Sequence, residues 1–78
     1  MAAVDVAKYI MEQLVEHPDD LSVSATDGEI LILINKADMG RVIGKMGKTA
    51  RAVRTVLRAA ASRENMRYNV EFKEKNES

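Results

Sequence analysis

The most informative segment of the chain is residues 42–48, Val42-Ile43-Gly44-Lys45-Met46-Gly47-Lys48. Two glycines separated by two residues give a short loop whose backbone a phosphate chain can approach closely. Lys45 and Lys48 place positive charge at this loop. A helical pattern begins directly after Gly47, and the free N–H groups of its first turn would face the same spot. Together these features predict a clamp for a nucleic-acid backbone.

The charge of the chain is divided strongly along its length, although its formal net charge is zero. Residues 1–35 hold seven acids and one base, whereas residues 36–67 hold nine bases and two acids. The glycine loop therefore lies in the basic segment. Such an asymmetry predicts a polyanionic partner for one surface of the molecule.

Length and composition restrict the class of protein. The 78 residues predict a single domain over 1–78, with an ordered core at 3–73 and a polar tail at 74–78. There is no cysteine, which excludes a disulfide framework and a thiolate metal site. The longest run of large apolar residues, at 30–34, is far shorter than the roughly 20 residues of a membrane span. The N-terminus lacks the pattern of a secretory signal, so we expect a cytoplasmic protein without membrane contact.

The residues before the loop predict a helix followed by a hairpin. Apolar side chains recur at helical spacing over residues 3–16, and Pro18 ends that pattern. Residues 21–25 alternate as a half-buried strand, and Asp27-Gly28 indicates a tight turn. The unbroken apolar run at 30–34 is typical of a central strand covered on both faces. Asp38 then has the chemistry to cap a short helix that ends at Ile43.

The residues after the loop predict one long helix and a last strand. Over residues 48–63 an apolar face lies opposite a face of bases and hydroxyls. Asn65 is a plausible helix stop, and apolar and polar residues then alternate over 68–73 as in a half-buried strand. The predicted buried face of the helix consists of Ala50, Val53, Val56, Leu57, Ala60 and Ala61.

This order of elements, with a GxxG loop between two helices, resembles the type II KH domain, an RNA-binding module. The resemblance covers about residues 3–73, and residues 39–56 look most like the small bacterial single-KH proteins called KhpA or YlqC. It implies an α+β fold of order α-β-β-α-α-β, with a three-stranded mixed sheet and helices packed on one face. Met46 departs from the resemblance, because a polar residue is more usual there.

The resemblance also implies a ligand and its contacts. The ligand would be single-stranded RNA or DNA, with about four nucleotides held along the loop and their bases in a groove beside it. Gly44 and Gly47 would allow close approach, Lys45 would face phosphate, and Ile43 would support the loop. For Arg54 the sequence allows two roles: a contact with nucleic acid or a position on a solvated helix face. The residues expected at the interface are Arg41, Val42, Ile43, Gly44, Lys45, Met46, Gly47, Lys48, Arg51 and Arg54.

The function implied is that of a non-enzymatic RNA chaperone or post-transcriptional regulator in bacteria. The resemblance suggests a homodimer, or a heterodimer with a larger KH-containing partner of the Jag-like (KhpB) type linked to cell-envelope and cell-division control. One alternative is a protein-interaction module that keeps the KH shape and uses the loop and Met46 to hold a partner. Another is a ribosome-associated factor. Since helices cover only one sheet face, Leu31 or Leu33 needs cover from a partner, from the tail or from strand twist.

The sequence gives little support for a nucleotide-binding loop, a catalytic site or a metal site. Gly47-Lys48-Thr49 matches the end of a Walker loop, but Val42 stands where that loop needs its first glycine. His17, the only histidine, is expected to be a surface residue. No nucleophile–base set or metal-ligand spacing is present, so we expect no enzyme activity, cofactor, metal or small-molecule substrate. With only Tyr9, Tyr68 and Phe72, the chain lacks the aromatic rows of RRM and cold-shock surfaces.

Overall fold

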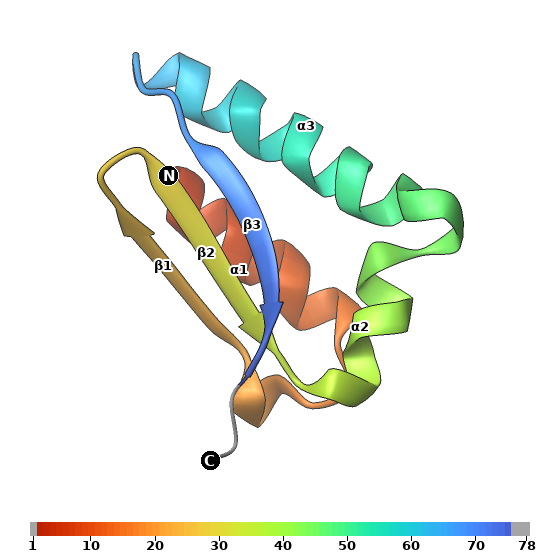
Figure 1. The fold of residues 1–78 in the computed structure, drawn as a ribbon. Coiled ribbons are helices and arrows are strands. Elements are labelled where there is room, and N and C mark those ends of the chain that lie inside the picture. Colours follow the sequence, from red (N-terminus) through yellow and green to blue (C-terminus); the bar gives the residue numbers. More distant parts are fainter. Residues whose placement is uncertain (1, 76–78) are drawn as a thin grey trace.

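The computed structural model describes residues 2–75, which form one layer of helices on a sheet (Figure 1). Two 3₁₀ turns, Pro18–Asp20 and Lys45–Gly47, join longer elements. The order confirms the predicted α-β-β-α-α-β arrangement. The elements are α1 (Ala3–Leu14), β1 (Ser22–Thr26), β2 (Glu29–Ile34), α2 (Lys36–Ile43), α3 (Lys48–Arg63) and β3 (Asn69–Glu74).

The sheet is three-stranded and mixed, as predicted, with β2 at its centre. β1 and β2 pair antiparallel through the Asp27-Gly28 turn, whose φ angles of 46° and 78° suit a two-residue hairpin. β3 pairs with β2 in parallel, so that Val70 lies beside Ile30. The predicted last strand is thus present one residue later at both ends. Of the predicted polar tail, residues 76–78 lie outside the described residues.

The core lies between the sheet and the helices. Ile30, Ile32 and Ile34 project from one face of β2 and are fully buried. They pack in one cluster with Met11 of α1 and Leu57 of α3. Burial of this kind contributes about 1.5–3 kcal/mol for each large aliphatic side chain, so this cluster holds the two long helices on the sheet. Among the described residues, no helix has both the length and the apolar character that spanning a bilayer requires.

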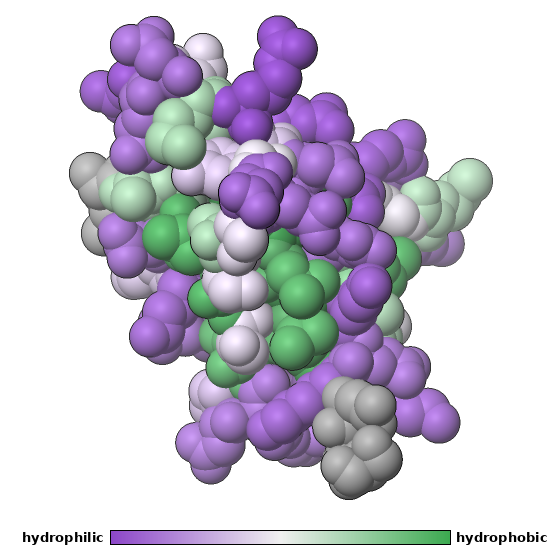
Figure 2. Space-filling view, turned by 60° about the vertical axis from the view of Figure 1, so that its left-hand side comes forward, coloured by the Kyte–Doolittle hydropathy of each residue, from purple (hydrophilic) through white to green (hydrophobic). Residues whose placement is uncertain are grey.

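The opposite face of β2 corrects the prediction that this strand is covered on both sides. Leu31 and Leu33 are half-buried there, and across the hairpin they face Ser24 and Ser22. Figure 2 shows an apolar area on this side of the molecule, surrounded by hydrophilic side chains. The unbroken apolar run at 30–34 was misleading because its residues alternate between the face of the sheet that the helices cover and the opposite, open face.

Two further details of the helices differ from the prediction. The N-cap of α2 is Asn35, whose Oδ1 accepts a hydrogen bond from Ala37 N at 2.7 Å, and not Asp38. Val56 is 47% exposed, although it was placed on the buried face of α3. At 100° per residue Val56 lies about 60° round the helix from Val53, on the side away from Leu57.

Asn65 ends α3 as predicted. Its φ of 59° places it in the left-handed region that often follows a helix. Its N–H donates to Ser62 O at 3.0 Å, and Met66 N–H donates to Ala61 O at 2.9 Å. This pair of bonds is a Schellman motif, which satisfies the last carbonyls of the helix and turns the chain back toward the sheet.

Candidate nucleic-acid interface

The GxxG loop is built from backbone conformations that favour glycine. Gly44 has φ 74° and ψ 177°, a region that essentially only glycine occupies. Gly47, at φ 76° and ψ 13°, is left-handed and precedes α3 directly. Between them Met46 is also left-handed, with φ 57° and ψ 27°. The chain therefore turns sharply within four residues, and this short bend joins α2 to α3.

Gly44 is required by packing as well as by its φ angle. A Cβ added to this residue would lie 2.3 Å from Thr49 Oγ1 and 2.8 Å from Thr49 Cβ. At Gly47, by contrast, an added Cβ would meet nothing within 4 Å. The first glycine therefore lets the loop pack against the first turn of α3, and the second allows the turn itself.

The positive charge of the loop faces solvent. Lys45 and Lys48 are exposed, and within residues 2–75 neither has an ion-pair partner. Met46 projects between them with 82% of its surface exposed. Two cations and one soft apolar side chain are therefore available to a ligand at the tip of the bend.

Arg51 stabilises the loop from α3. Its guanidinium donates to Met46 O at 2.8 Å and, through Nε, to Gly47 O at 3.4 Å. The predicted phosphate contact is thus a residue that already bonds to the loop backbone. Its charge still lies at the loop, and two of the loop carbonyls already accept hydrogen bonds from it.

The beginning of α3 adds a further attraction for anions. The helix has Gly47 at its N-cap position and no side-chain cap. The N–H groups of its first turn therefore lack the side-chain acceptor that usually satisfies one of them. The partial positive charge of the helix N-terminus adds to that of Lys45 and Lys48.

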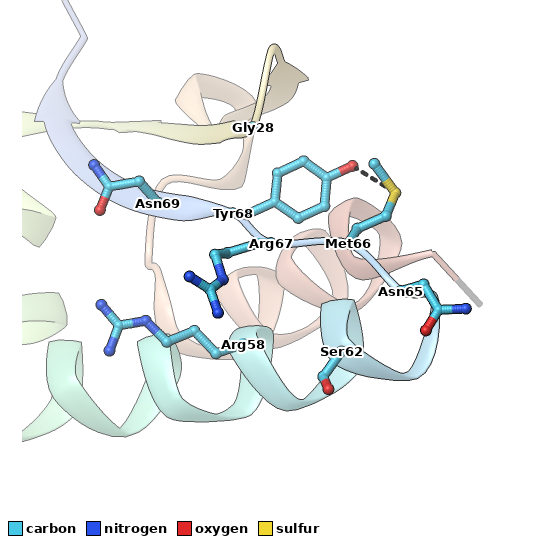
Figure 3. A pocket seen from close by; sticks show the side chains of 8 residues that line it. All are labelled: Gly28, Arg58, Ser62, Asn65, Met66, Arg67, Tyr68 and Asn69. Carbon is cyan, nitrogen blue, oxygen red and sulfur yellow. Dashed lines mark hydrogen bonds between the residues drawn. The ribbon is translucent and has the colours of Figure 1, made fainter.

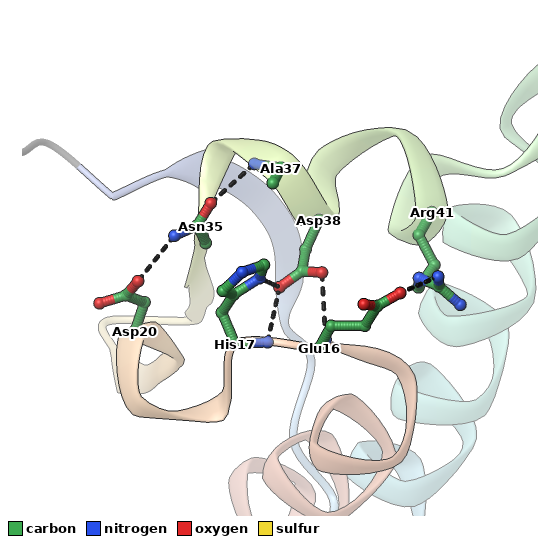
Figure 4. A network of polar contacts seen from close by, with 7 residues as sticks. All are labelled: Glu16, His17, Asp20, Asn35, Ala37, Asp38 and Arg41. Atoms are coloured by element: carbon green, nitrogen blue, oxygen red, sulfur yellow. Dashed lines mark hydrogen bonds and ion pairs between the residues drawn. The ribbon is translucent and has the colours of Figure 1, made fainter.

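A buried carboxylate fixes α2, and with it the loop, against the end of α1 (Figure 4). Asp38 is 2% exposed and accepts hydrogen bonds from Glu16 N at 3.0 Å and His17 N at 3.1 Å. The ring Nδ1 of His17 lies 3.1 Å from the Oδ2 atom of Asp38. Burial raises the pKa of Asp38, but the bonds from Glu16 and His17 outweigh it and leave the pKa below its ordinary value.

Several expected interface residues have other roles in the structure. Arg41 forms an ion pair with Glu16, so an acid accompanies its charge. Val42, expected at the interface, is completely buried and can support the site only through packing. Ile43, half-buried at the end of α2, keeps part of its surface available beside the loop.

Arg54 connects α3 to the last strand. Its Nε donates to Val70 O at 3.3 Å, and its guanidinium carbon lies 5.2 Å from the centre of the Phe72 ring. The side chain is half-buried. Arg54 therefore links α3 to β3, and its contacts differ from those of a freely solvated helix face.

Sequence reasoning missed Thr49 and Asp38. The Gly47-Lys48-Thr49 motif drew attention to a nucleotide loop, whereas Thr49 packs against Gly44. Asp38 read as a helix cap, and nothing local shows that its partners stand more than twenty residues earlier. Within residues 2–75, no three His, Cys, Asp or Glu side chains come together as metal ligands would.

The family model described as the KhpA/KhpB KH domain matches residues 4–72. The chain belongs to the KhpA/KhpB KH-domain family. A relative named RNA-binding protein KhpA from Clostridium acetobutylicum is 47% identical, over 81% of this chain and 89% of the relative. A protein of the same name from Clostridium perfringens is 41% identical, over 87% and 96%. One from Chlamydia caviae is 35% identical, over 90% and 95%. No solved structure matches the chain significantly.

Membership in the KhpA/KhpB family agrees with the geometry of the site. The match includes both glycines of the loop, the two helices that it joins and nearly all of the sheet. The fold is accordingly a type II KH domain. In KH domains the GxxG loop clamps the backbone of about four nucleotides.

Proposed function

We propose that this chain binds single-stranded RNA at its GxxG loop, without catalysing a reaction. The observation that carries the proposal is the bend formed by Gly44, Met46 and Gly47, all at positive φ, with Lys45, Met46 and Lys48 exposed at the start of α3, which has no side-chain cap. Relatives named RNA-binding protein KhpA support the choice of ligand. Single-stranded DNA shares the phosphate chemistry, and it is a weaker ligand only where the 2′-hydroxyl is read.

The proposed contacts are mainly electrostatic. Lys45 and Lys48 pair with successive phosphates, and the first N–H groups of α3 donate to the phosphate nearest the loop. Met46 lays its thioether against a base or sugar, which a flexible and polarisable side chain permits. Ile43 supplies an apolar wall for the adjoining base. Because aromatic stacking is scarce, affinity is expected to be modest and to depend strongly on salt.

In the cell we propose a role as an RNA chaperone or post-transcriptional regulator. A single small module gains affinity when it works in pairs, either with a second copy or with a KhpB/Jag-like partner. The family model groups KhpA and KhpB, which favours such a partner. The same resemblance supports a link to cell-envelope and division control. A cytoplasmic location is part of this proposal.

A charge-reversal titration tests the loop. The variant K45D/M46D is titrated with a short fluorescent single-stranded RNA at two salt concentrations, beside the wild type. We expect the variant to bind at least about tenfold more weakly at low salt and to have a shallower salt dependence, because Lys48 still contacts phosphate. The matched control K8D/Q13D makes the same charge change on the outer face of α1, where both side chains are exposed, and should bind nearly as the wild type.

The outcomes of this titration separate the ligand from the site. No binding by the wild type at low salt would contradict RNA binding itself. Equal binding by wild type and K45D/M46D would remove the loop from the interface. Equal weakening by K45D/M46D and by the control would show that overall charge, and not the loop, determines binding.

A protein-interaction module is the second candidate, since Met46 is strongly exposed and Leu31 and Leu33 lie on an open sheet face. If the loop mainly holds a second copy, K45D/M46D changes the elution volume in size-exclusion chromatography while RNA affinity stays unchanged. A ribosome-associated factor would share the RNA chemistry. It would differ by co-sedimenting with ribosomal particles after treatment with high salt.

A further inference from the structure

A hollow lies at the other end of α3 from the GxxG loop. Its volume is about 890 Å³. It opens between the second half of α3, the start of β3 and the hairpin turn at Gly28 (Figure 3). The residues that line it are Gly28, Arg58, Ser62, Asn65, Met66, Arg67, Tyr68 and Asn69. The lining is rich in hydrogen-bond donors and includes no acid.

Two guanidinium groups face this hollow. Figure 3 shows Arg58 from α3 and Arg67 from the loop before β3 directed into the same space, with the amide of Asn69 above them. Both arginines are exposed, and within residues 2–75 neither has an ion-pair partner. Two like charges that converge without a counterion repel each other, and a bound anion offsets that repulsion. Guanidinium forks match phosphate oxygens in particular.

Arg54 lies along α3 between the hollow and the GxxG loop. Arg58 follows Arg54 by one helical turn, and Arg54 bridges α3 to Val70 of β3. The helix rises 1.5 Å per residue, so Arg58 lies about 15 Å along α3 from Lys48. A strand held at the loop and running beside α3 reaches the hollow with its next nucleotides.

We propose that the Arg58–Arg67 hollow binds the phosphate backbone of the same RNA strand, beyond the nucleotides clamped by the GxxG loop. This inference rests on the proposed function. Arg58 and Arg67 pair with one or two phosphates, and Asn69 offers its amide to a base or sugar edge. The binding site is therefore longer than the loop requires, and short RNA uses only part of it.

The test compares two RNA lengths and two double variants. Wild type, R58Q/R67Q and the control K8Q/R63Q are titrated with oligouridines of about four nucleotides, the length that a KH loop clamps, and of about twice that length. The control removes two positive charges from exposed side chains that do not line the hollow. Thermal melting establishes that each variant is folded, which is expected because all four substituted side chains are exposed.

We expect R58Q/R67Q to weaken binding of the longer RNA about tenfold and to lower its salt slope by about one to two. Binding of the shorter RNA should change by less than about twofold, and the control should bind both as the wild type does. Unchanged binding of the longer RNA by R58Q/R67Q would overturn the inference and leave these arginines to a protein partner. Equal weakening for both lengths would also overturn it. If the wild type binds neither RNA, the proposed function fails as well.

Discussion

Thr49 of α3 occupies the space beside Gly44, with Oγ1 only 2.3 Å from where a Cβ on Gly44 would lie. The first glycine of the GxxG loop is therefore fixed by a neighbour as well as by its own φ of 74°. The second glycine has only its φ of 76° to satisfy. Glycine is thus required at the two positions of the motif for different physical reasons.

This difference predicts unequal effects of alanine at the two positions. Gly44→Ala should lower the free energy of unfolding by about 2–4 kcal/mol, because strain at an unfavourable φ and ψ adds to overlap with Thr49. Gly47→Ala should lower it by only about 1–2 kcal/mol, from its left-handed conformation alone. Urea denaturation of both variants measures the difference. Equal losses would show that Thr49 moves aside freely.

The backbone conformation of Met46 predicts that replacing this residue by glycine stabilises the protein. Its side chain is 82% exposed, so replacement loses little packing, while its φ of 57° is unfavourable for methionine. Met46→Gly should raise the free energy of unfolding by about 0.5–1 kcal/mol, since glycine adopts this conformation without strain. Met66→Gly is the matched control, because Met66 is also exposed but has no positive φ, and it should give no gain. A loss of stability in Met46→Gly would mean that the Met46 side chain contributes packing in solution.

Asp38 predicts how stability depends on pH. Its pKa is lowered in the folded protein, so as the pH falls the unfolded chain binds the proton first and unfolding is favoured. The contribution is therefore complete above the unfolded pKa of about 3.9 and is lost as the pH falls through the lower folded value. The pKa of Asp20 is also lowered, by hydrogen bonds from Asn35 and Lys75, and acts in the same direction.

The substitution Asp38→Asn tests this anchor. An amide has one oxygen to accept bonds where the carboxylate has two, so the N–H of Glu16 or of His17 loses its partner. We expect lower stability at neutral pH and a smaller loss between pH 5 and pH 2 than in the wild type, measured by thermal melting in a series of buffers. Asp19→Asn, an exposed neighbour, is the control. An unchanged acid limb in Asp38→Asn would assign the acid sensitivity to other carboxylates.

Arg54 should matter more for stability than its place on a basic helix face suggests. Arg54→Gln removes the contact with the Phe72 ring and weakens the bond to Val70 O, and should cost about 1 kcal/mol. Arg58→Gln, one turn further on, alters an exposed side chain and should change stability by less than about 0.5 kcal/mol. Chemical denaturation of both variants compares them. Equal effects of the two substitutions would mean that the contacts of Arg54 with Phe72 and Val70 contribute nothing to stability.

Local sequence patterns predicted the elements well and their environments less well. The order of helices and strands, the Asp27-Gly28 turn and the stop at Asn65 follow from residues within a few positions of one another. The core face of α3 was nearly right, with Val56 wrong because the apolar stripe is narrower than the wheel suggested. The coverage of β2 was wrong because an apolar run does not reveal whether one face or both are closed.

Contacts between distant residues were beyond the reach of the sequence. Asp38 looked like a helix cap until α1 placed Glu16 and His17 beside it. Arg41 looked like part of the basic patch until Glu16 paired with it. The loop residues Lys45, Met46 and Lys48 could be foreseen, because their exposure follows from the bend itself. That they contact RNA stays a prediction.

A crosslinking map of bound RNA shows directly whether the GxxG loop is the RNA-binding site. Photoactivatable single-stranded RNA is bound to the wild-type protein at low salt, irradiated and located by mass spectrometry of the crosslinked peptides. We expect crosslinks concentrated at residues 43–51, with further crosslinks at residues 65–69 only for the longer RNA. Crosslinks concentrated on the outer face of α1, or around Leu31 and Leu33 on the open sheet face, would contradict it.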